Sequence, residues 1–505
     1  MDELRTQLAE HRAEVRAGRP EAVARQERAG KRTARQRLAL LLDDDSFVEL
    51  DLHRRADPEA PSTDGVVAGA GTIEGRRVAV YAQDFTVSGG SFGRAHSAKI
   101  HKVLDLAVST GCPVIALNDS GGARIQEGVL SLDGCGAMFR RQVGASGVVP
   151  QISVVLGPCA GAAAYSPALA DIVFMVRDIA QMYLTGPDVV AAVTGESITH
   201  DALGGAEVHG THSGVATVVA DDEESCFTEL RHLVSLLPLN NAELPPAEPA
   251  CGATDDVRPR LAEVVPPDPR APYDMRDVVA EITDDDWFEV HERWATNVVC
   301  GLARIDGQVV GIVGNQPMVM AGVLDGNASV KAARFVRFCD AFNIPIVTLV
   351  DVPGFLPGSD QERAGIIRDG AQLLYAYSEA TVPRIQVIVR KSYGGAYIVM
   401  DSRSIGCDLS LAWPTNEIAV MGAEGAVNVL HRKVLATSSE PDTLRAMLVK
   451  EYTETFMHPR FAAEHGLVDD IIDPVDTRAA VARGLAMLRA KRAPRAPRKH
   501  GNPPL

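Results

Sequence analysis

The clearest pattern in the chain is an alternation of apolar strands with helix-forming stretches that occurs twice. An apolar run over residues 113–122 ends in a glycine-rich turn, and a similar run returns over residues 345–354. A second apolar run follows each copy, led by Pro150 in the first and by Pro383 in the second. Apolar runs separated by helical stretches are typical of buried strands in parallel sheets. The pattern therefore predicts an α/β fold with two similar domains.

Each second run leads directly into a turn of small residues. The turn begins at Gly161 in the first copy and at Gly394 in the second, eleven residues after the leading proline in both. A helix-forming stretch follows, and the first N–H groups of a helix have no intrahelical partner, so they can hold an anion or a developing oxyanion. Tight packing of a helix on a strand explains either turn alone. The duplication favours two anion sites that could face each other across a shared site.

The length and the repeat predict the domain boundaries. A chain of 505 residues is long enough for two large domains. Residues 240–273 are rich in proline and poor in apolar residues, which indicates an interdomain linker. Residues 286–290 then restart the pattern of residues 46–50. We expect an N-terminal domain over residues 1–245 and a C-terminal domain over residues 246–505.

Helices are expected at both ends of the chain. The apolar spacing in the opening segment predicts one helix there, and a second is expected over residues 33–42, before the first strands. Residues 443–456 and 477–491 should form the last helices. The proline-rich and basic tail from residue 492 onward is expected to be extended.

Charge and cysteine usage limit the partners and the compartment. Lysine and arginine number 50 against 66 acidic residues, a net charge of −16, which argues against binding to nucleic acid or to an anionic membrane. The eight cysteines are scattered without zinc-site spacing, so free thiols in a reducing compartment are expected and no metal is. Residues 142–170 carry no charge, but prolines and glycines interrupt them, as in a buried strand and helix. No signal or transit peptide is evident, and we expect a cytoplasmic protein.

Two further motifs could carry chemistry. Residues 119–127 place Gly121, Gly122, Ala123 and Arg124 between a strand and a helix, where they could cradle a thioester or a phosphate. Equally, Asp119 could be a helix cap and the glycines could serve close packing.

The second motif is a Gly-x-Ser-x-Gly sequence over residues 89–93, which matches a hydrolase nucleophile elbow centred on Ser91. The flanking strand over 78–87 and helix over 95–107 fit, but neither His209 nor His431 has a supporting pattern. No P-loop lysine motif and no well-placed Gly-x-Gly-x-x-Gly occurs, so direct use of ATP or a dinucleotide has no support.

Several segments taken together resemble the carboxyltransferase (β) subunit of biotin-dependent acyl-CoA carboxylases, nearest to the propionyl-CoA type. The resemblance runs through most of the chain and is carried by residues 157–167, 185–188, 194–196, 203–206, 343–358, 391–397 and 412–415. It implies two tandem crotonase-like (ClpP/crotonase) domains related by internal duplication, and a homohexamer with each active site between the N-terminal domain of one subunit and the C-terminal domain of another. It also implies a separate α subunit that carries biotin carboxylase and the carboxybiotin, which agrees with the missing P-loop.

The resemblance also implies the site residues. Gly395 and Ala396 match an oxyanion hole for the ureido oxygen of biotin, on the C-terminal side. Gly161 and Ala162 match the hole for the enolate of the acyl-CoA thioester, on the N-terminal side, with the register open by one residue because of the internal repeat. The residues expected to bind biotin or coenzyme A are Gly121, Gly122, Ala123, Arg124, Tyr165 and Tyr397.

The chain departs from the usual family pattern at several positions. Ala162 replaces a common glycine, Ile398 stands where propionyl-type members carry aspartate, and Arg363 and Asp369 replace a tyrosine and a histidine. Variation at Ile398 goes with acyl preference in the family. The expected activity is carboxyl transfer from carboxybiotin to the α-carbon of a short-chain acyl-CoA, such as propionyl-CoA or acetyl-CoA. A biotin-dependent decarboxylase or transcarboxylase subunit, a catalytically silent scaffold subunit and, last, a serine hydrolase are the alternatives.

Overall fold

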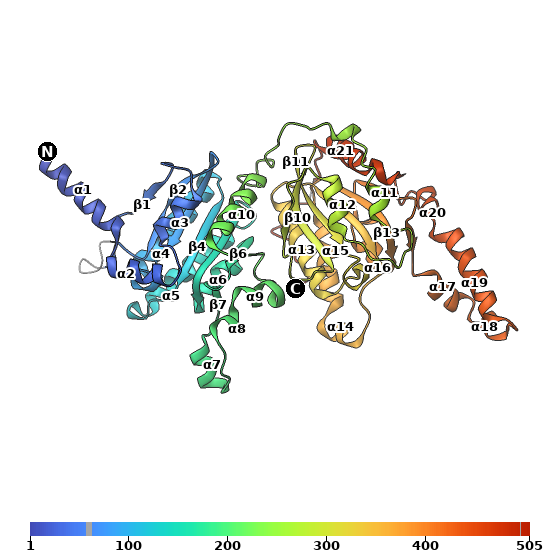
Figure 1. Cartoon of the computed structure of the whole chain (residues 1–505), viewed down its shortest axis with the longest axis horizontal. Coiled ribbons are helices and arrows are strands. Elements are labelled where there is room, and N and C mark those ends of the chain that lie inside the picture. Colours follow the sequence, from blue (N-terminus) through green and yellow to red (C-terminus); the bar gives the residue numbers. More distant parts are fainter. Residues whose placement is uncertain (57–62, 495, 505) are drawn as a thin grey trace. The chain divides into compact units, whose positions relative to one another are not determined.

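The computed structural model describes residues 1–56, 63–494 and 496–504 of the chain. The chain divides into two compact units, which we call unit 1 (Met1–Leu244) and unit 2 (Pro245–Leu505) (Figure 1). Each unit has its own sheet and its own apolar core. Within the described ranges, no helix combines the length and the apolar character that a membrane crossing requires.

Among its described residues, unit 1 has an eight-stranded sheet in the order β1-β2-β3-β4-β5-β6-β8, with the short β7 paired to β5. The β1, β2 and β3 strands pair antiparallel, and the remaining pairs are parallel. The strands are β1 (Val48–Leu50), β2 (Val66–Ile73), β3 (Arg76–Gln83), β4 (Val114–Ser120), β5 (Gln151–Ala160), β6 (Ile172–Val176), β7 (Gln181–Tyr183) and β8 (Val218–Ala220).

Helices cover both faces of this sheet, and every residue of its central strand β4 is accordingly buried. The α4 and α5 helices pack together on the face that bears the core of Ile100, Val103 and Met138. The α3 and α10 helices contact β3 and β6. The helices are α1 (Asp2–Ala17), α2 (Pro20–Arg28), α3 (Ala34–Leu41), α4 (Arg94–Thr110), α5 (Val129–Ala145), α6 (Tyr165–Ala168), α7 (Pro187–Thr194), α8 (His200–Gly204), α9 (Ala206–Val208) and α10 (Glu223–Leu236).

Unit 2 repeats this sheet over its described residues, in the order β16-β14-β13-β12-β11-β10-β9 with β15 paired to β13. The three strands at the β9 end are again antiparallel and the others parallel. The strands are β9 (Phe288–Val290), β10 (Val298–Ile305), β11 (Gln308–Asn315), β12 (Ile346–Val352), β13 (Arg384–Tyr393), β14 (Leu409–Ala412), β15 (Glu417–Ala419) and β16 (Asp470–Ile471).

The sheet of unit 2 is also covered on both faces. The α12 and α21 helices supply Val279 and Val481 to one core, and α13 packs with α15. In Figure 1, α17, α18 and α19 form a group of helices beyond the end of this sheet. The helices are α11 (Leu261–Val264), α12 (Met275–Ile282), α13 (Gly326–Ala341), α14 (Ser359–Ala364), α15 (Ile366–Glu379), α16 (Gly394–Val399), α17 (Ala423–Leu430), α18 (Arg432–Thr437), α19 (Pro441–Tyr452), α20 (Pro459–Glu464) and α21 (Thr477–Leu488).

The duplication extends to irregular features of the backbone. The β2–β3 hairpin turns through Glu74 and Gly75, and the β10–β11 hairpin through Asp306 and Gly307, with positive φ at both residues of each turn as two-residue hairpins favour. The register of β4 against β5 shifts between Asn118 and Ser120, and that of β12 against β13 shifts between Val350 and Val352. Two units with the same sheet order and the same irregularities are copies of one fold.

Some sequence expectations need adjustment. The α2 helix was not expected, whereas α3 forms the helix expected over residues 33–42. Part of the stretch expected to be a linker packs into unit 2, where Ala253, Leu261 and Tyr273 join its core. The high proline content predicted an irregular backbone there, but the burial of the stretch depends on these few apolar side chains.

Candidate active site

The two small-residue turns have the same geometry. Ala160 and Tyr393 end β5 and β13 in nearly identical extended conformations, and the next residues, Gly161 and Gly394, have φ of 62° and 60°. This left-handed conformation favours glycine, which explains the first residue of each turn. The internal repeat therefore aligns Gly161 with Gly394.

This alignment bears on the register that the sequence left open. Gly395 and Ala396 correspond to Ala162 and Ala163 in the repeat, so Ala162 is the residue that belongs to both possible registers. The turn in unit 1 continues as the 3-10 helix η3 (Gly161–Ala164), and the turn in unit 2 continues as α16. In both, the first N–H groups have no acceptor within their own helix.

Gly395 is exposed within unit 2, and the space where a side chain would begin is open. A Cβ atom added there would meet only the Cε2 atom of Phe355, at 3.9 Å, which is ordinary contact. A mostly apolar cavity of about 570 Å³ lies beside Gly395. Ile398, 43 % exposed, contributes to its wall. The other side chains that line it come from Phe355, Leu356, Pro357, Glu362, Ile366, Ile367, Ala371, Leu374 and Val399.

The two expected tyrosines lie in different environments. Tyr165 is 51 % exposed and makes an edge contact with Phe139, with ring centroids 6.2 Å apart. Tyr397 follows Ala396 in α16, and its buried hydroxyl has no hydrogen-bond partner among the described residues. Burial raises the pKa of Tyr397, so it stays a neutral hydroxyl near neutral pH.

The turn after β4 is closed by its own hydrogen bonds. The N–H of Gly121 donates to Gly89 O (2.9 Å), and the N–H of Gly122 donates to Ser120 Oγ (3.2 Å). Gly122 has φ of 95°, and a Cβ there would lie 2.8 Å from Ala160 O, so this glycine permits close packing of the turn on the end of β5. The N–H of Ala123 is not among these turn contacts. Of the four expected ligands, Gly121 and Gly122 thus have their N–H groups directed at protein atoms.

The guanidinium of Arg124 is also directed at protein groups. It donates to Asp64 Oδ1 (2.6 Å), to Glu127 Oε1 (2.9 Å) and to both oxygens of Ser91. Burial lowers the pKa of Arg124, but the hydrogen bonds and charges of Asp64 and Glu127 together outweigh burial and raise the pKa above its usual range. In this geometry Arg124 braces the turn; a ligand would have to compete with two carboxylates for it.

The geometry around Ser91 does not fit a nucleophile. Its backbone is extended (φ −70°, ψ 145°), whereas an elbow holds the serine in a strained turn. Its hydroxyl donates to Ser88 O (2.7 Å) and accepts from Arg124 Nε (3.2 Å). The equivalent place in unit 2 is taken by Val323, which cannot act as a nucleophile. His209, one candidate base, is bound to Met182 O (2.7 Å).

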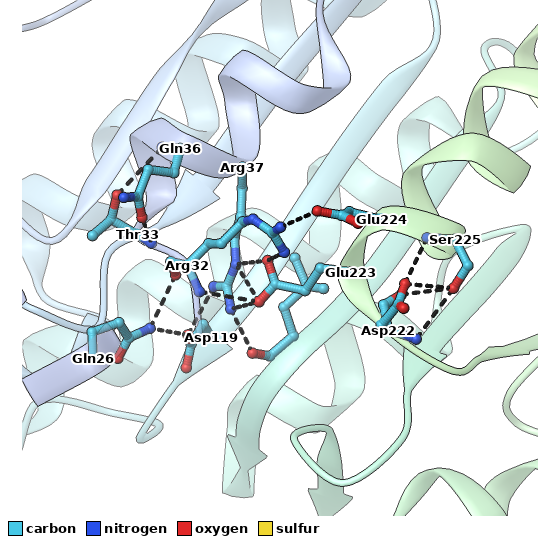
Figure 2. Close-up of polar contacts among 11 residues, drawn as sticks. Gln26, Arg32, Thr33, Gln36, Arg37, Asp119, Asp222, Glu223, Glu224 and Ser225 are labelled. Carbon is cyan, nitrogen blue, oxygen red and sulfur yellow. Dashed lines mark hydrogen bonds and ion pairs between the residues drawn. The ribbon is translucent and has the colours of Figure 1, made fainter. Parts of the chain in front are cut away.

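A buried charge network behind β4 was not anticipated from the sequence. Asp119 lies within β4, fully buried, and is therefore not a helix cap. It accepts from Arg37 Nη1 (2.8 Å) and Gln26 Nε2 (3.0 Å), which Figure 2 shows. It also accepts from Lys31 Nζ (2.7 Å). Arg37 also donates to Glu223 Oε1 (2.8 Å), which ties α3 to α10. The network anchors the N-terminal helices on the strand that precedes the Gly121 turn.

Both helices that supply the charges of this network begin with a capping box. Thr33 and Gln36 form it at the start of α3, and Asp222 and Ser225 form it at the start of α10, as Figure 2 shows. Each box satisfies two backbone donors at a helix start. The caps therefore fix the helix ends from which Arg37 and Glu223 extend.

In unit 2 the equivalent buried aspartate has different partners. Asp351, in the place of Asp119, accepts from Arg390 Nε (2.9 Å) and from the N–H of Lys391 (3.1 Å). Arg390 lies on β13 where unit 1 has Gly157, and a Cβ at Gly157 would lie 2.0 Å from Asp119 Oδ1. Unit 1 thus takes its cations from Lys31 and from Arg37 of α3, and the absence of a side chain at Gly157 leaves room for them. The sequence did contain a signal for this buried charge: an aspartate stands at the same place in both repeated apolar runs.

Metal ligands do not gather in the part of the chain that the structure describes, where no group of three or more His, Cys, Asp or Glu residues could hold a metal ion. The two turns and the cavity beside Gly395 are thus the features that a catalytic role would use.

Comparison with known proteins places these features in a family. The carboxyl transferase domain family matches residues 25–503. A propionyl-CoA carboxylase carboxyltransferase subunit from Haloferax mediterranei is 53 % identical over 100 % of this chain and 99 % of its own length. The α subunit of methylmalonyl-CoA decarboxylase from Veillonella parvula is 52 % identical over 99 % of this chain and 98 % of its own.

A solved structure agrees at the level of the fold. The hexameric transcarboxylase 12S, crystallised with methylmalonyl-coenzyme A and methylmalonic acid, superimposes with a TM-score of 0.96. It is 50 % identical in sequence, and the match covers 99 % of this chain and 98 % of that one. The α/β fold with two tandem crotonase-like units is thereby confirmed. The chain belongs to the carboxyl transferase domain family.

Proposed function

We propose that this chain is the carboxyltransferase subunit of a biotin-dependent acyl-CoA carboxylase. It would move CO2 from carboxybiotin, carried by a partner α subunit with biotin carboxylase activity, to the α-carbon of a short-chain acyl-CoA such as propionyl-CoA or acetyl-CoA. The observation that carries the proposal is the duplicated turn. One chain that presents two sets of unpaired helix-start N–H groups can stabilise two developing negative charges.

The turn in unit 2 fits biotin. The space in front of Gly395 is open, and the apolar cavity beside it suits a compact ring system with one polar oxygen. We assign the N–H groups of Gly395 and Ala396 to the ureido oxygen. We assign Tyr397, the next residue of α16, to the binding of biotin. When bound, carboxybiotin supplies the CO2 and the acceptor for the α-proton.

The turn in unit 1 is assigned to the acyl-CoA thioester. Removal of the α-proton leaves negative charge on the thioester oxygen, and N–H groups at Gly161 and Ala162, or at Ala162 and Ala163, would stabilise it. One such donor is typically worth about 3 kcal/mol of the barrier. Tyr165 and the turn of Gly121, Gly122, Ala123 and Arg124 are proposed to contact coenzyme A. Arg124 would then have to exchange a carboxylate for a phosphate.

The assembly and compartment follow from the same proposal. We propose a homohexamer that binds the α subunit, in the cytoplasm, with the N-terminal unit on the acyl-CoA side and the C-terminal unit on the biotin side. The eight cysteines are unpaired, and seven of them are buried. Free thiols of this kind suit a reducing compartment.

The test needs no partner. The purified chain is incubated with malonyl-CoA or methylmalonyl-CoA and free biotin or biocytin, and the decarboxylated acyl-CoA is followed by mass spectrometry. We expect turnover that depends on biotin. Biotin-independent hydrolysis of the thioester, or no turnover with either substrate, would contradict the proposal.

A decarboxylase or transcarboxylase subunit is the second candidate, favoured by the 52 % identity to a methylmalonyl-CoA decarboxylase subunit. Such a subunit would run the same chemistry in reverse or with another carrier. Co-purification decides between the two: a biotin carboxylase partner supports the carboxylase, and a membrane-bound partner supports the decarboxylase.

A further inference from the structure

The helix that follows the turn of unit 2 ends at an unusual residue. The N–H of Met400 donates to Ala396 O (2.9 Å), and the next residue, Asp401, has φ of 60°. Glycine is the usual residue in this left-handed conformation after a helix. Asp401 is also fully buried. An acidic side chain that is both buried and on an unfavourable backbone must be held by strong contacts.

Arg384 holds it. Arg384 is the first residue of β13, and its Nη1 donates to Asp401 Oδ1 in an ion pair whose side chains are 3 % and 0 % exposed. Its Nη2 donates to Ile405 O (3.2 Å), and Thr348 Oγ1 donates to Asp401 Oδ2 (3.4 Å). Because β13 leads into α16, the pair joins the start of the strand to the residue just beyond the helix. It closes the strand–turn–helix segment on itself.

The equivalent place in unit 1 is neutral. The β5 and β13 strands have the same length and enter their turns in the same way, so Arg384 corresponds to Gln151. Gln151 Nε2 donates to Gln142 O (2.9 Å), and Gln142 Nε2 donates to Ser166 O (3.1 Å). The two turns have the same shape, but among the described residues an ion pair at this place is found in unit 2 and not in unit 1.

The charged and titratable groups that face Asp401 come from several elements: Arg384 of β13, Tyr377 of α15, Cys407 and Asp408 before β14, and Lys491 after α21. Burial raises the pKa of Asp401 to about 7, and Asp408 adds to this, whereas Arg384, Thr348 and Lys491 lower it. The charge that holds the pair together therefore changes close to neutral pH.

We propose that the Arg384–Asp401 pair positions the Gly395–Ala396 turn. By fixing where α16 ends, it fixes the direction in which the N–H groups at the start of α16 point. Arg384 and Asp401 are thus positioning residues that act through α16 and touch no substrate. The inference rests on the proposed carboxyltransferase function, in which these N–H groups bind the ureido oxygen.

Three substitutions at one position separate the possible roles. Asp401→Ala removes the carboxylate and keeps the unfavourable backbone. Asp401→Gly removes the carboxylate but adopts φ of 60° without strain, so a purely conformational role would leave this variant fully active. Asp401→Asn keeps a side-chain oxygen that can accept from Arg384, and asparagine tolerates the left-handed backbone, so this variant should keep most of the activity. Asp284→Asn is the control. Asp284 pairs with Arg478 (2.6 Å), and Arg478 lies on α21, which belongs to the same unit but is not part of the segment around α16.

Turnover is measured by the biotin-dependent decarboxylation of malonyl-CoA or methylmalonyl-CoA. Asp401→Ala and Asp401→Gly should lower kcat by at least about tenfold, because small misplacements of catalytic groups have effects of this size. The KM for the acyl-CoA should stay within about twofold, since its thioester is assigned to the turn of unit 1. Asp401→Asn and Asp284→Asn should stay within about threefold of the unmodified protein.

Hydrogen exchange supplies a readout that does not depend on activity. Mass spectrometry of peptides that cover residues 394–402 should show faster exchange in Asp401→Ala and Asp401→Gly, and no change in Asp284→Asn. Wild-type kcat and unchanged exchange in Asp401→Gly would overturn the inference, even if Asp401→Ala failed to fold. Absence of biotin-dependent turnover in the unmodified protein would instead overturn the proposed function, and the exchange data would still test the pair.

Discussion

Replacement of Gly395 by valine is the most direct test of the turn in unit 2. Gly395 does not have a left-handed backbone, and an added Cβ would meet only Phe355, at 3.9 Å. The fold should therefore accept the side chain. The two methyl groups of valine would stand in the open space beside the cavity, where the proposed ureido oxygen approaches the N–H groups.

The expected effect follows from the loss of one hydrogen-bond donor. Such a donor is typically worth about 3 kcal/mol in the transition state. At 1.36 kcal/mol for each factor of ten, this corresponds to a decrease in kcat of roughly 150-fold. The melting temperature should move by no more than about 3 °C, because no buried contact is lost and none is compressed.

The assay is biotin-dependent decarboxylation, with a thermal melt on the same samples. Gly144→Val is the matched control, since a Cβ at Gly144, on α5, has nothing within 4 Å. Gly394→Val gives the opposite contrast: φ of 60° and Val420 O at 3.2 Å predict a loss of about 1–2 kcal/mol of stability. Normal turnover in Gly395→Val, or a decrease no larger than in Gly144→Val, would refute the assignment of this N–H.

Four further outcomes are expected. Ile398→Asp should shift the preference between malonyl-CoA and methylmalonyl-CoA by roughly tenfold, since one methyl group in a pocket is worth about 1–3 kcal/mol; an unchanged ratio of kcat/KM values counts against Ile398 as a specificity residue. Asp119→Asn should cost about 3–5 kcal/mol in urea unfolding, because it removes the carboxylate that pairs with Lys31 and one of the two carboxylates that pair with Arg37. The pKa of Asp401 is raised from 3.8 to about 7, so the folded state binds more protons between these values and this group's contribution to stability falls as pH rises from 4 to 7; unfolding curves of Asp401→Asn should lack this slope. Ser91→Ala should keep turnover within about twofold, and a fluorophosphonate probe should not label Ser91.

Local sequence determined the elements and the duplication. Continuous apolar runs follow from burial in a parallel sheet, so both copies of the strand pattern could be predicted. The glycines at 161 and 394 could be recognised because a left-handed φ is a property of one residue and its neighbours. The family resemblance, carried by the same turns, is confirmed by the match over residues 25–503.

Contacts between side chains that are distant in sequence could not be predicted from local sequence patterns. Arg37 meets Asp119 and Glu223 across separations of 82 and 186 residues, and periodicity carries no information about such pairings. Arg124 has the sequence context of an anion ligand, yet its position beside Asp64 directs its hydrogen bonds to protein groups. Which charge meets which depends on strand order and helix packing, and these are properties of the whole fold.

The two turns show the division most clearly. The sequence by itself determined that both exist, because each requires a glycine at its first residue and small residues after it. Only the tertiary structure decided their alignment and their support: Gly161 with Gly394, neutral amides in unit 1, and the Arg384–Asp401 ion pair in unit 2. Backbone conformation is set over a few residues, whereas the pairing of buried charges is set by which distant segments the core brings together.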